Sequence, residues 1–528
     1  MNKIETTRLQ SKFISYLLAV LGLFLFAGRL GAEGLLGLFF SYGLYYIFIL
    51  LFSEGTANVL GRIYASRFSK KQYKNADVVG RRIALIYFFT SLVLTGIFLI
   101  LSFVIPAVFA DFKYSGKMLL LLTPCILLRS IDSILQGFLK GRNFDKIADV
   151  AYILRVSLIV VLGLLFMNAF SDYGTKLSNL LRLPLYGELV FASSVCTVCI
   201  VSEIIVFLFL IFFYLYVYHR MEFDLDDGMR QVDNKNFTFS LWLELAGAEL
   251  VKNALLCVPM FVTVFLLVNR AGSEREGLIK LLLEAACVIG IPVGLYSVES
   301  IVFSVKSAGY LKKNDERAFK FIFQNGSHLA FVNGLYLAAF PVIVSFDISN
   351  VFGMSHELDY MMAVFSPVIL FAIMSIYFGV VFIRSKKVLM MLPGLFIGDA
   401  AVVVYNLFLG KNHMPETRFG VSLSLFTIGF FLTLFAIYLF VYKVNISLLR
   451  EVVVPMGAVA GALLITMLLR KIIFSHISPI VTIFICYIFG LFAYWSFLLL
   501  LRDFREGELK GAYFAGIIKG LGQLLRVF

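Results

Sequence analysis

The stretch IALIYFFTSLVLTGIFLILSFVIPAVFA, residues 83–110, runs for 28 positions without a charged side chain. A helix needs about 20 apolar residues to cross a bilayer, so this stretch is typical of a membrane span. The whole chain of 528 residues has the same character, because 60% of its residues are hydrophobic and only 15% are charged. Soluble domains carry roughly a quarter charged residues. The composition therefore predicts an all-α polytopic membrane protein and argues against a water-soluble fold.

Apolar stretches of this kind recur along the chain and predict about fourteen transmembrane helices. They lie near residues 13–27, 36–60, 83–110, 118–139, 150–170, 188–218, 237–268, 278–303, 328–346, 360–383, 388–409, 421–442, 452–469 and 480–501. The first stretch follows a basic segment and resembles a secretory signal. No small-residue cleavage site follows it, because Arg29 and Glu33 interrupt the chain there. We expect it to remain as an uncleaved first span.

The basic residues predict the orientation of these spans. Of the 46 lysines and arginines, 31 lie in the two tails and the even-numbered connections, and 12 lie in the odd-numbered connections. Short cytoplasmic loops are enriched in Lys and Arg, so both termini are expected on the cytoplasmic side. The net charge of +13 is thereby explained without a basic domain. We expect no nucleic-acid partner.

A weak internal repeat predicts how the spans are organised. Residues 65–71 after the second span align with residues 307–313 after the eighth, at an offset of about 242. Parallel repeats related by an axis along the membrane normal are common in transporters. We expect two six-helix bundles related by a pseudo-two-fold axis, followed by two further helices. The expected segments are an N-terminal bundle at 1–220, a cytoplasmic linker at 221–236, a second bundle at 237–445, helices 13 and 14 at 446–502, and a cytoplasmic amphipathic tail at 503–528.

Ionisable residues inside the expected spans are the candidates for a substrate-binding site. A charge at mid-bilayer costs about 2.5 to 3.5 kcal/mol on insertion scales, so such a residue usually marks a functional site. The candidates within spans are Glu54, Arg129, Asp132, Arg155, Glu244, Glu249, Lys252 and Asp399. Arg129 with Asp132, and Glu249 with Lys252, are also spaced as internal ion pairs that only fix helix packing. Arg155, Glu244 and Asp399 have no obvious partner in their own span, which favours positions lining a water-filled cavity.

The sequence gives little support for enzyme chemistry. It contains no H-E-x-x-H, no G-x-S-x-G and no Walker-type phosphate loop, and its five histidines are dispersed. Its six cysteines lie inside apolar runs, where they behave as small hydrophobic residues. We therefore expect neither an enzyme nor a metal site nor a cofactor. A transporter without an ATP site draws on an ion gradient, such as H+ or Na+, on the membrane potential, or on mass action.

Three motifs resemble one transporter family. The segment RLGAEG at 29–34, Ser53-Glu54-Gly55, and QGFLKGRN at 136–143 followed by Arg155 are similar to motifs of the multidrug/oligosaccharidyl-lipid/polysaccharide (MOP) flippase superfamily. The resemblance is to its polysaccharide-transporter branch, which includes the stage V sporulation protein B-like proteins. The related lipid II flippases carry arginines within the first span and just before the Glu-Gly, whereas this chain has residues 24–27 and 50–52 without charge there. The resemblance therefore favours the wider polysaccharide class over a strict lipid II assignment.

The resemblance implies a flippase that moves an undecaprenyl-pyrophosphate-linked oligosaccharide across a bacterial plasma membrane by alternating access. It also implies a cationic central cavity to which Arg29, Glu54, Arg129 and Arg155 contribute. The implied partners are the lipid-linked sugar, membrane lipids and polysaccharide-assembly enzymes. One alternative is a multidrug or cation exporter of the same superfamily, which needs acidic cavity groups such as Glu54, Asp132, Glu244 and Asp399. Another alternative is a membrane-embedded glycosyltransferase or polymerase.

Overall fold

The computed structural model is α-helical, and no strand occurs among the residues that it describes. It describes residues 3–70, 72–109, 112, 114–183, 185–220, 239–270, 275–299, 301–352, 358–385, 387–410, 413–444, 447, 449–472, 478–504 and 515–525, some of them by their backbone alone. The expected cytoplasmic linker at 221–236 and most of the expected tail lie outside these residues.

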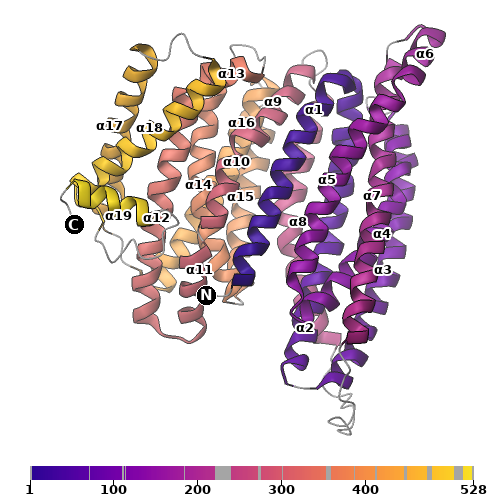
Figure 1. Ribbon diagram of the computed structural model, residues 1–528, viewed down its shortest axis with the longest axis horizontal. Helices are drawn as coiled ribbons and strands as arrows, with labels where there is room; N and C mark the ends of the chain where they lie inside the picture. The colour runs from indigo at the N-terminus through magenta and orange to yellow at the C-terminus, as the bar shows by residue number, and fades with distance from the viewer. Residues whose placement is uncertain are drawn as a thin grey trace. The chain divides into compact units, whose positions relative to one another are not determined.

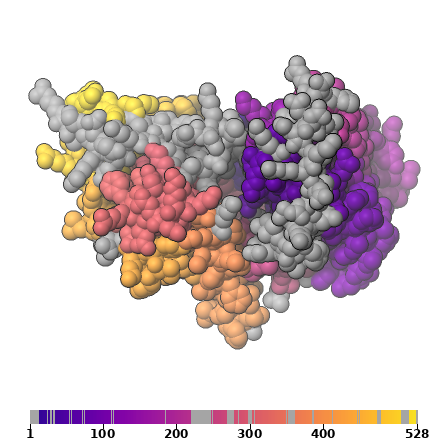
Figure 2. Space-filling model, turned by 90° about the horizontal axis from the view of Figure 1, so that it is seen from below, coloured from indigo at the N-terminus to yellow at the C-terminus, as the bar shows by residue number. Residues whose placement is uncertain are grey.

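Contacts divide the chain into two compact units, an N-terminal unit that ends at Ile279 and a C-terminal unit that begins at Lys280. The N-terminal unit contains α1 (Lys3–Phe48), the π-helical segment η1 (Ile49–Glu54), α2 (Gly55–Phe68), α3 (Tyr73–Val108), α4 (Ser115–Gly141), α5 (Asp145–Ala169), α6 (Ser171–Leu181), α7 (Leu185–Arg220) and α8 (Phe239–Arg270) (Figure 1). Figure 2 shows the described residues of this unit, coloured indigo to magenta, as seen from below.

The C-terminal unit is built from shorter and more interrupted helices. Helix α9 (Arg275–Val288) crosses the division between the units. The C-terminal elements are α10 (Gly290–Glu299), α11 (Ile301–Lys312), α12 (Glu316–Ile343), α13 (Ser345–Phe352), α14 (Leu358–Arg384), η6 (Val388–Met391), α15 (Leu392–Val404), η7 (Tyr405–Leu409), α16 (Pro415–Ala436), η9 (Ile437–Val441), η10 (Leu449–Val453), α17 (Val454–Ile472), α18 (Pro479–Leu500) and α19 (Ala515–Leu524).

The contacts group α8 with the helices that precede it, whereas the sequence division begins a second bundle at residue 237. The assignment of two six-helix bundles related by a pseudo-two-fold axis stays a prediction.

The helix lengths agree with the span count expected from the sequence. Within the described part of the chain, twelve helices are long and apolar enough to cross a membrane, and two shorter apolar helical stretches lie at Phe13–Gly22 and Ala285–Tyr296. The expected first span therefore corresponds to a short apolar piece of the long helix α1. The expected eighth span, 278–303, is divided among α9, α10 and α11 rather than being one helix.

A glycine interrupts α1 where the first two expected spans meet. Gly31 has φ 63° and ψ −178°, a backbone conformation that residues with a Cβ rarely adopt. A Cβ at Gly31 would overlap the carboxylate of Glu188, which comes from α7. The same carboxylate accepts a hydrogen bond from the Gly34 backbone N–H at 3.4 Å. The glycines of the RLGAEG motif thus let α7 pack closely against the bend in α1.

The QGFLKGRN motif at 136–143 joins the ends of four helices. Gly141 at the end of α4 lies so close to Tyr64 of α2 that an added Cβ would be 2.7 Å from the Tyr64 ring. Arg142 donates from Nε to the Tyr64 hydroxyl at 3.0 Å, and that hydroxyl donates to Asp77 of α3 at 2.6 Å. The Arg142 guanidinium also lies 5.5 Å from the ring centroid of Tyr218 on α7. Within this unit the motif therefore fixes the helix ends to one another.

Aromatic side chains fill the interior of the C-terminal unit. Phe323 of α12 stacks on Tyr438 of η9 with ring centroids 4.2 Å apart, and Phe378 of α14 meets Tyr438 at 5.1 Å. The Tyr438 hydroxyl donates to the backbone oxygen of Phe378 at 3.0 Å. Aromatic pairs at these separations add to the apolar burial, so they hold α12, α14 and the end of α16 together.

The last two long helices are anchored to this aromatic interior. Tyr494 of α18 donates its hydroxyl to the backbone oxygen of Val332 in α12 at 2.9 Å. Arg470 of α17 pairs with Asp347 of α13 at 2.8 Å and donates to the Ile343 backbone oxygen at 2.7 Å. Helices α17 and α18 are therefore integral to the C-terminal unit.

Candidate functional site

The candidate site in the N-terminal unit centres on Arg155, which α5 places between α4 and α7. Its Nη2 donates to Asp132 Oδ2 at 2.7 Å, and its Nε donates to Glu203 Oε2 at 2.9 Å. The three side chains are almost fully enclosed, with exposed fractions of 6% for Arg155, 0% for Asp132 and 3% for Glu203. One guanidinium thus bridges two carboxylates from two neighbouring helices.

Two tyrosines and a second arginine complete this cluster. Tyr45 of α1 donates its hydroxyl to Glu203 Oε1 at 3.2 Å. The Arg129 guanidinium lies 5.1 Å from the ring centroid of Tyr152, and the Arg155 guanidinium lies 6.0 Å from the same centroid. Arg129 is itself buried. The structure therefore brings Arg129, Asp132 and Arg155 together, with Glu203 and Tyr45 as partners from α7 and α1.

The formal charges of this buried-charge cluster balance. The two arginines offset the carboxylates Asp132 and Glu203, so the cluster as a whole is neutral when all four are ionised. Removing a charged pair from water costs several kcal/mol per ion. Attraction between the ions and their hydrogen bonds must offset this cost. Charge-assisted hydrogen bonds of 2.7 to 2.9 Å are of the strong kind. Loss of one partner would leave an uncompensated charge among apolar helices.

Arg155 differs from its expected setting, since the structure gives it two acidic partners on other spans. Asp132 bonds to Arg155 across helices, a contact that the spacing of Arg129 and Asp132 within α4 does not reveal. Glu203 and Tyr45 are missing from the sequence-derived site. The signal for Glu203 was present, because it is a carboxylate in the middle of the apolar helix α7; Tyr45 gave no such signal.

Asp399 lies in the C-terminal unit and, unlike Asp132 and Glu203, is not paired with an arginine among the described residues. It sits on α15 beside Gly398, whose backbone packs directly on Phe426 of α16. Its exposed fraction is 7%, and neither carboxylate oxygen has a hydrogen-bond donor among the residues that the structure describes. A buried carboxylate in this condition binds a proton or a cation more readily than one held by arginine.

The remaining candidates fall on α1, η1 and α8. Arg29, Glu54, Glu244 and Glu249 have described backbones, but their side chains lie outside the described part of the structure. Lys252 is half-buried on α8.

The next residue, Asn253, donates Nδ2 to the backbone oxygen of Leu50 at 2.7 Å. This bond joins α8 to the π-helical segment η1, whose wider turns leave a carbonyl to be satisfied from outside.

Comparison with known proteins identifies the fold. No family model and no curated protein sequence matches the chain. A structure described as lipid II flippase MurJ in an inward closed conformation matches with a TM-score of 0.67 at 15% identity, over 93% of this chain and 98% of that one. The chain therefore shares the fold of this solved structure.

Two further matches carry the superfamily name. An inward-facing multidrug resistance MATE family transporter matches with a TM-score of 0.57 at 14% identity, over 82% of this chain and 96% of that one. A MOP superfamily transporter from Pyrococcus furiosus, described as having a binding pocket of reverse polarity, matches with a TM-score of 0.54 at 14% identity, over 84% and 99%.

This shared fold confirms the predicted class, an all-α multi-pass membrane protein with about 12 to 14 membrane helices. The structural neighbours are transporters rather than enzymes. Within the described residues, no group of three or more His, Cys, Asp or Glu side chains is arranged to hold a metal ion.

Proposed function

We propose that this chain is a transporter that moves an undecaprenyl-pyrophosphate-linked oligosaccharide across the bacterial plasma membrane by alternating access. The observation that carries the proposal is the fold match to a lipid II flippase over 93% of the chain. The motifs at 29–34 and 136–143 support the same substrate class, and in this structure both are sites of close helix packing. The class of substrate is a lipid with an anionic diphosphate and a sugar head group.

A diphosphate that crosses the membrane inside the protein needs cationic side chains that bind it there. In this proposal Arg29 and Arg129 receive the diphosphate, because guanidinium groups bind phosphate oxygens in pairs. Arg155 keeps α4, α5 and α7 in register through Asp132 and Glu203, and so acts on the substrate through its neighbours. Glu54, Glu244, Glu249 and Lys252 belong to the proposed lining as well.

The lipids that copurify with the protein test the substrate class. Mass spectrometry of the purified wild type should recover a polyprenyl pyrophosphate that carries a sugar. An Arg29→Ala, Arg129→Ala double variant should recover at least tenfold less of it, because each charge-assisted contact contributes about 1.5 kcal/mol or more. Arg317, exposed on α12, supplies a control for the loss of a cation as Arg317→Ala. Recovery of ordinary phospholipids alone would count against the proposal.

A second candidate function is export of cationic compounds with an H+ or Na+ gradient. Asp399 favours it, because both of its oxygens lack donors within the described residues. The match to a multidrug resistance transporter supports the same candidate. Resistance assays in a drug-sensitive bacterial strain separate the two functions. A resistance phenotype that disappears in Asp399→Asn would favour the exporter.

The proposed location is the plasma membrane with both termini in the cytoplasm, next to polysaccharide-assembly enzymes. The asymmetry of 31 against 12 basic residues in the loops supports this orientation. Labelling of single cysteines by a membrane-impermeant reagent tests it: Ser69→Cys, after α2, should be protected in intact cells, whereas Lys176→Cys on α6 should react.

A further inference from the structure

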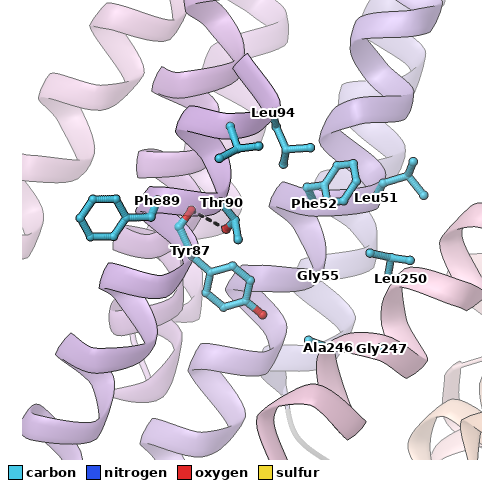
Figure 3. Close-up of a pocket in the computed structure, with 11 residues that line it drawn as sticks. Leu51, Phe52, Gly55, Tyr87, Phe89, Thr90, Leu94, Ala246, Gly247 and Leu250 are labelled. Atoms are coloured by element: carbon cyan, nitrogen blue, oxygen red, sulfur yellow. Dashed lines mark hydrogen bonds between the residues drawn. The ribbon is translucent and has the colours of Figure 1, made fainter. Parts of the chain in front are cut away.

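An apolar pocket of about 450 Å³ lies in the wall of the N-terminal unit, in the size range of ligand pockets. It is lined by η1, the start of α2, α3 and α8 (Figure 3). Leu51 and Phe52 come from η1, Tyr87 and Leu94 from α3, and Leu250 from α8. The lining is almost wholly hydrocarbon, so the pocket suits an alkyl chain rather than a sugar or an ion.

Small residues lie along the edge of this pocket, and a side-chain amide joins two of the elements that line it. Gly55, Ala246 and Gly247 lie along its edge, and a Cβ built on Gly247 would meet no atom within 4 Å. The bond from Asn253 to the Leu50 backbone oxygen holds α8 against η1, about one turn from Leu250 and nearly two turns from Gly247. The Thr90 hydroxyl, which lies at the pocket, is already donated to backbone oxygens of its own helix at 2.9 and 3.0 Å. The Thr90 O–H is therefore committed to its own helix, and only the hydroxyl oxygen remains as an acceptor.

Two exposed arginines lie on the same helix faces as the pocket. Arg62 follows Gly55 by seven residues on α2, and Arg82 precedes Phe89 by seven residues on α3. Seven residues are two helical turns, so each arginine lies about 10 Å from the pocket on the same stripe. Helices α2 and α3 are joined by the short turn at 69–72, so both arginines lie on the side of the pocket that faces this turn.

This arrangement has the polarity of a membrane lipid. The hydrocarbon lining lies deeper in the span, and two guanidinium groups lie nearer its end, where lipid phosphates are found. Cations near a membrane surface attract anionic lipids. An apolar hollow in a protein wall does not hold water well, whereas an alkyl chain fills it with favourable contacts.

We propose that this pocket and Arg62 with Arg82 form a binding site for an anionic phospholipid of the surrounding leaflet. One acyl chain occupies the pocket, and the phosphate lies between the two guanidinium groups. The lipid is a resident of the site, not the transported molecule, so the proposal stands apart from the transport function. It assigns a role to a surface formed by α2, α3 and α8 that the buried-charge cluster does not use.

Native mass spectrometry of the full chain in detergent, titrated with dioleoyl-phosphatidylglycerol or dioleoyl-phosphatidylcholine, tests the proposal. The wild type should show one phosphatidylglycerol site that is at least tenfold tighter than any phosphatidylcholine site. Arg62→Gln and Arg82→Gln should each weaken it about fivefold. Arg81→Gln removes the same charge from the adjacent stripe and should leave the affinity unchanged.

The pocket itself is tested by filling it. Gly247→Leu should weaken phosphatidylglycerol binding about tenfold, because its side chain takes the space of the acyl chain. Gly96→Leu is the matched control, since a Cβ at Gly96 on α3 also meets no atom within 4 Å, and Gly96 does not line the pocket. Equal affinity for both lipids, equal loss with Arg81→Gln, or no loss with Gly247→Leu would each overturn the proposal. So would a site that takes only a polyprenyl pyrophosphate and no phosphatidylglycerol.

Discussion

The two units of this chain hold the carboxylates of the candidate site in different ways. The N-terminal unit encloses Arg155 with three further ionisable side chains, and the four formal charges cancel. The C-terminal unit encloses a stack of rings around Tyr438 and places Asp399 on α15 without a donor among the described residues. A balanced cluster stabilises one arrangement of helices, whereas a carboxylate without a donor is available to a mobile cation. The difference predicts that loss of a charge destabilises the first unit more than the second.

The largest effect is expected from breaking the cluster in the N-terminal unit. Arg155→Ala leaves Asp132 and Glu203 as buried carboxylates without their shared cation, which costs about 3 to 5 kcal/mol. We expect a large fall in the thermal unfolding midpoint of the protein in detergent and a fall in its abundance in the membrane.

A compensated variant separates charge balance from packing. Arg155→Met combined with Asp132→Asn removes one charge of each sign, leaves Arg129 and Glu203 to balance each other, and should recover much of the lost midpoint. An Arg155→Ala protein that unfolds at the wild-type temperature would show that the cluster does not stabilise the unit.

The same substitution in both units gives a matched intermediate test. Tyr45→Phe removes a hydroxyl that donates to the Glu203 carboxylate, and Tyr438→Phe removes one that donates to a backbone oxygen. Hydrogen bonds to charged groups contribute about 1.5 to 3 kcal/mol, and those between neutral groups contribute about 0.5 to 1.5 kcal/mol. The thermal unfolding midpoint should therefore fall more for Tyr45→Phe than for Tyr438→Phe. The reverse order would remove the contrast between the units.

The smallest effect on stability is expected at Asp399. Asp399→Asn removes a charge that no described residue pairs with, so the unfolding midpoint should stay the same or rise slightly. Transport driven by an H+ or Na+ gradient should nevertheless lose its dependence on that gradient, as measured in proteoliposomes. Asn406→Asp, two turns further along the chain, is the control: it adds a carboxylate near Asp399 without removing Asp399 itself. A marked loss of stability in Asp399→Asn would mean that Asp399 has a structural partner.

Much of the fold could be predicted from the sequence, because a bilayer imposes long apolar helices that composition alone reveals. The positions at which helices bend or are interrupted could not be predicted. Helix α1 bends at Gly31, which has a positive φ and lies close to Glu188. The expected span at 278–303 is divided into three helices. Hydropathy averages over such local turns and therefore counts spans better than it locates them.

The site was predicted in part for a related reason. The cost of a charge in lipid identified Arg129, Asp132, Arg155 and Asp399 from the sequence, and all four are buried in the structure. Which helices lie side by side cannot be deduced from one sequence, so the pairing of Arg155 with Glu203 was missed. The side chains of Arg29, Glu54, Glu244 and Glu249 lie outside the described part, and their roles stay predictions.

Reconstituted transport tests the central claim most directly. Purified wild-type protein in liposomes would be given a short undecaprenyl-pyrophosphate-linked oligosaccharide in one leaflet, and access of an external glycosidase to the sugar would report its movement. The account predicts that the sugar becomes accessible faster than in protein-free liposomes, and that a cationic dye loaded into the same liposomes is not exported. Export of the dye without movement of the lipid-linked sugar would contradict it.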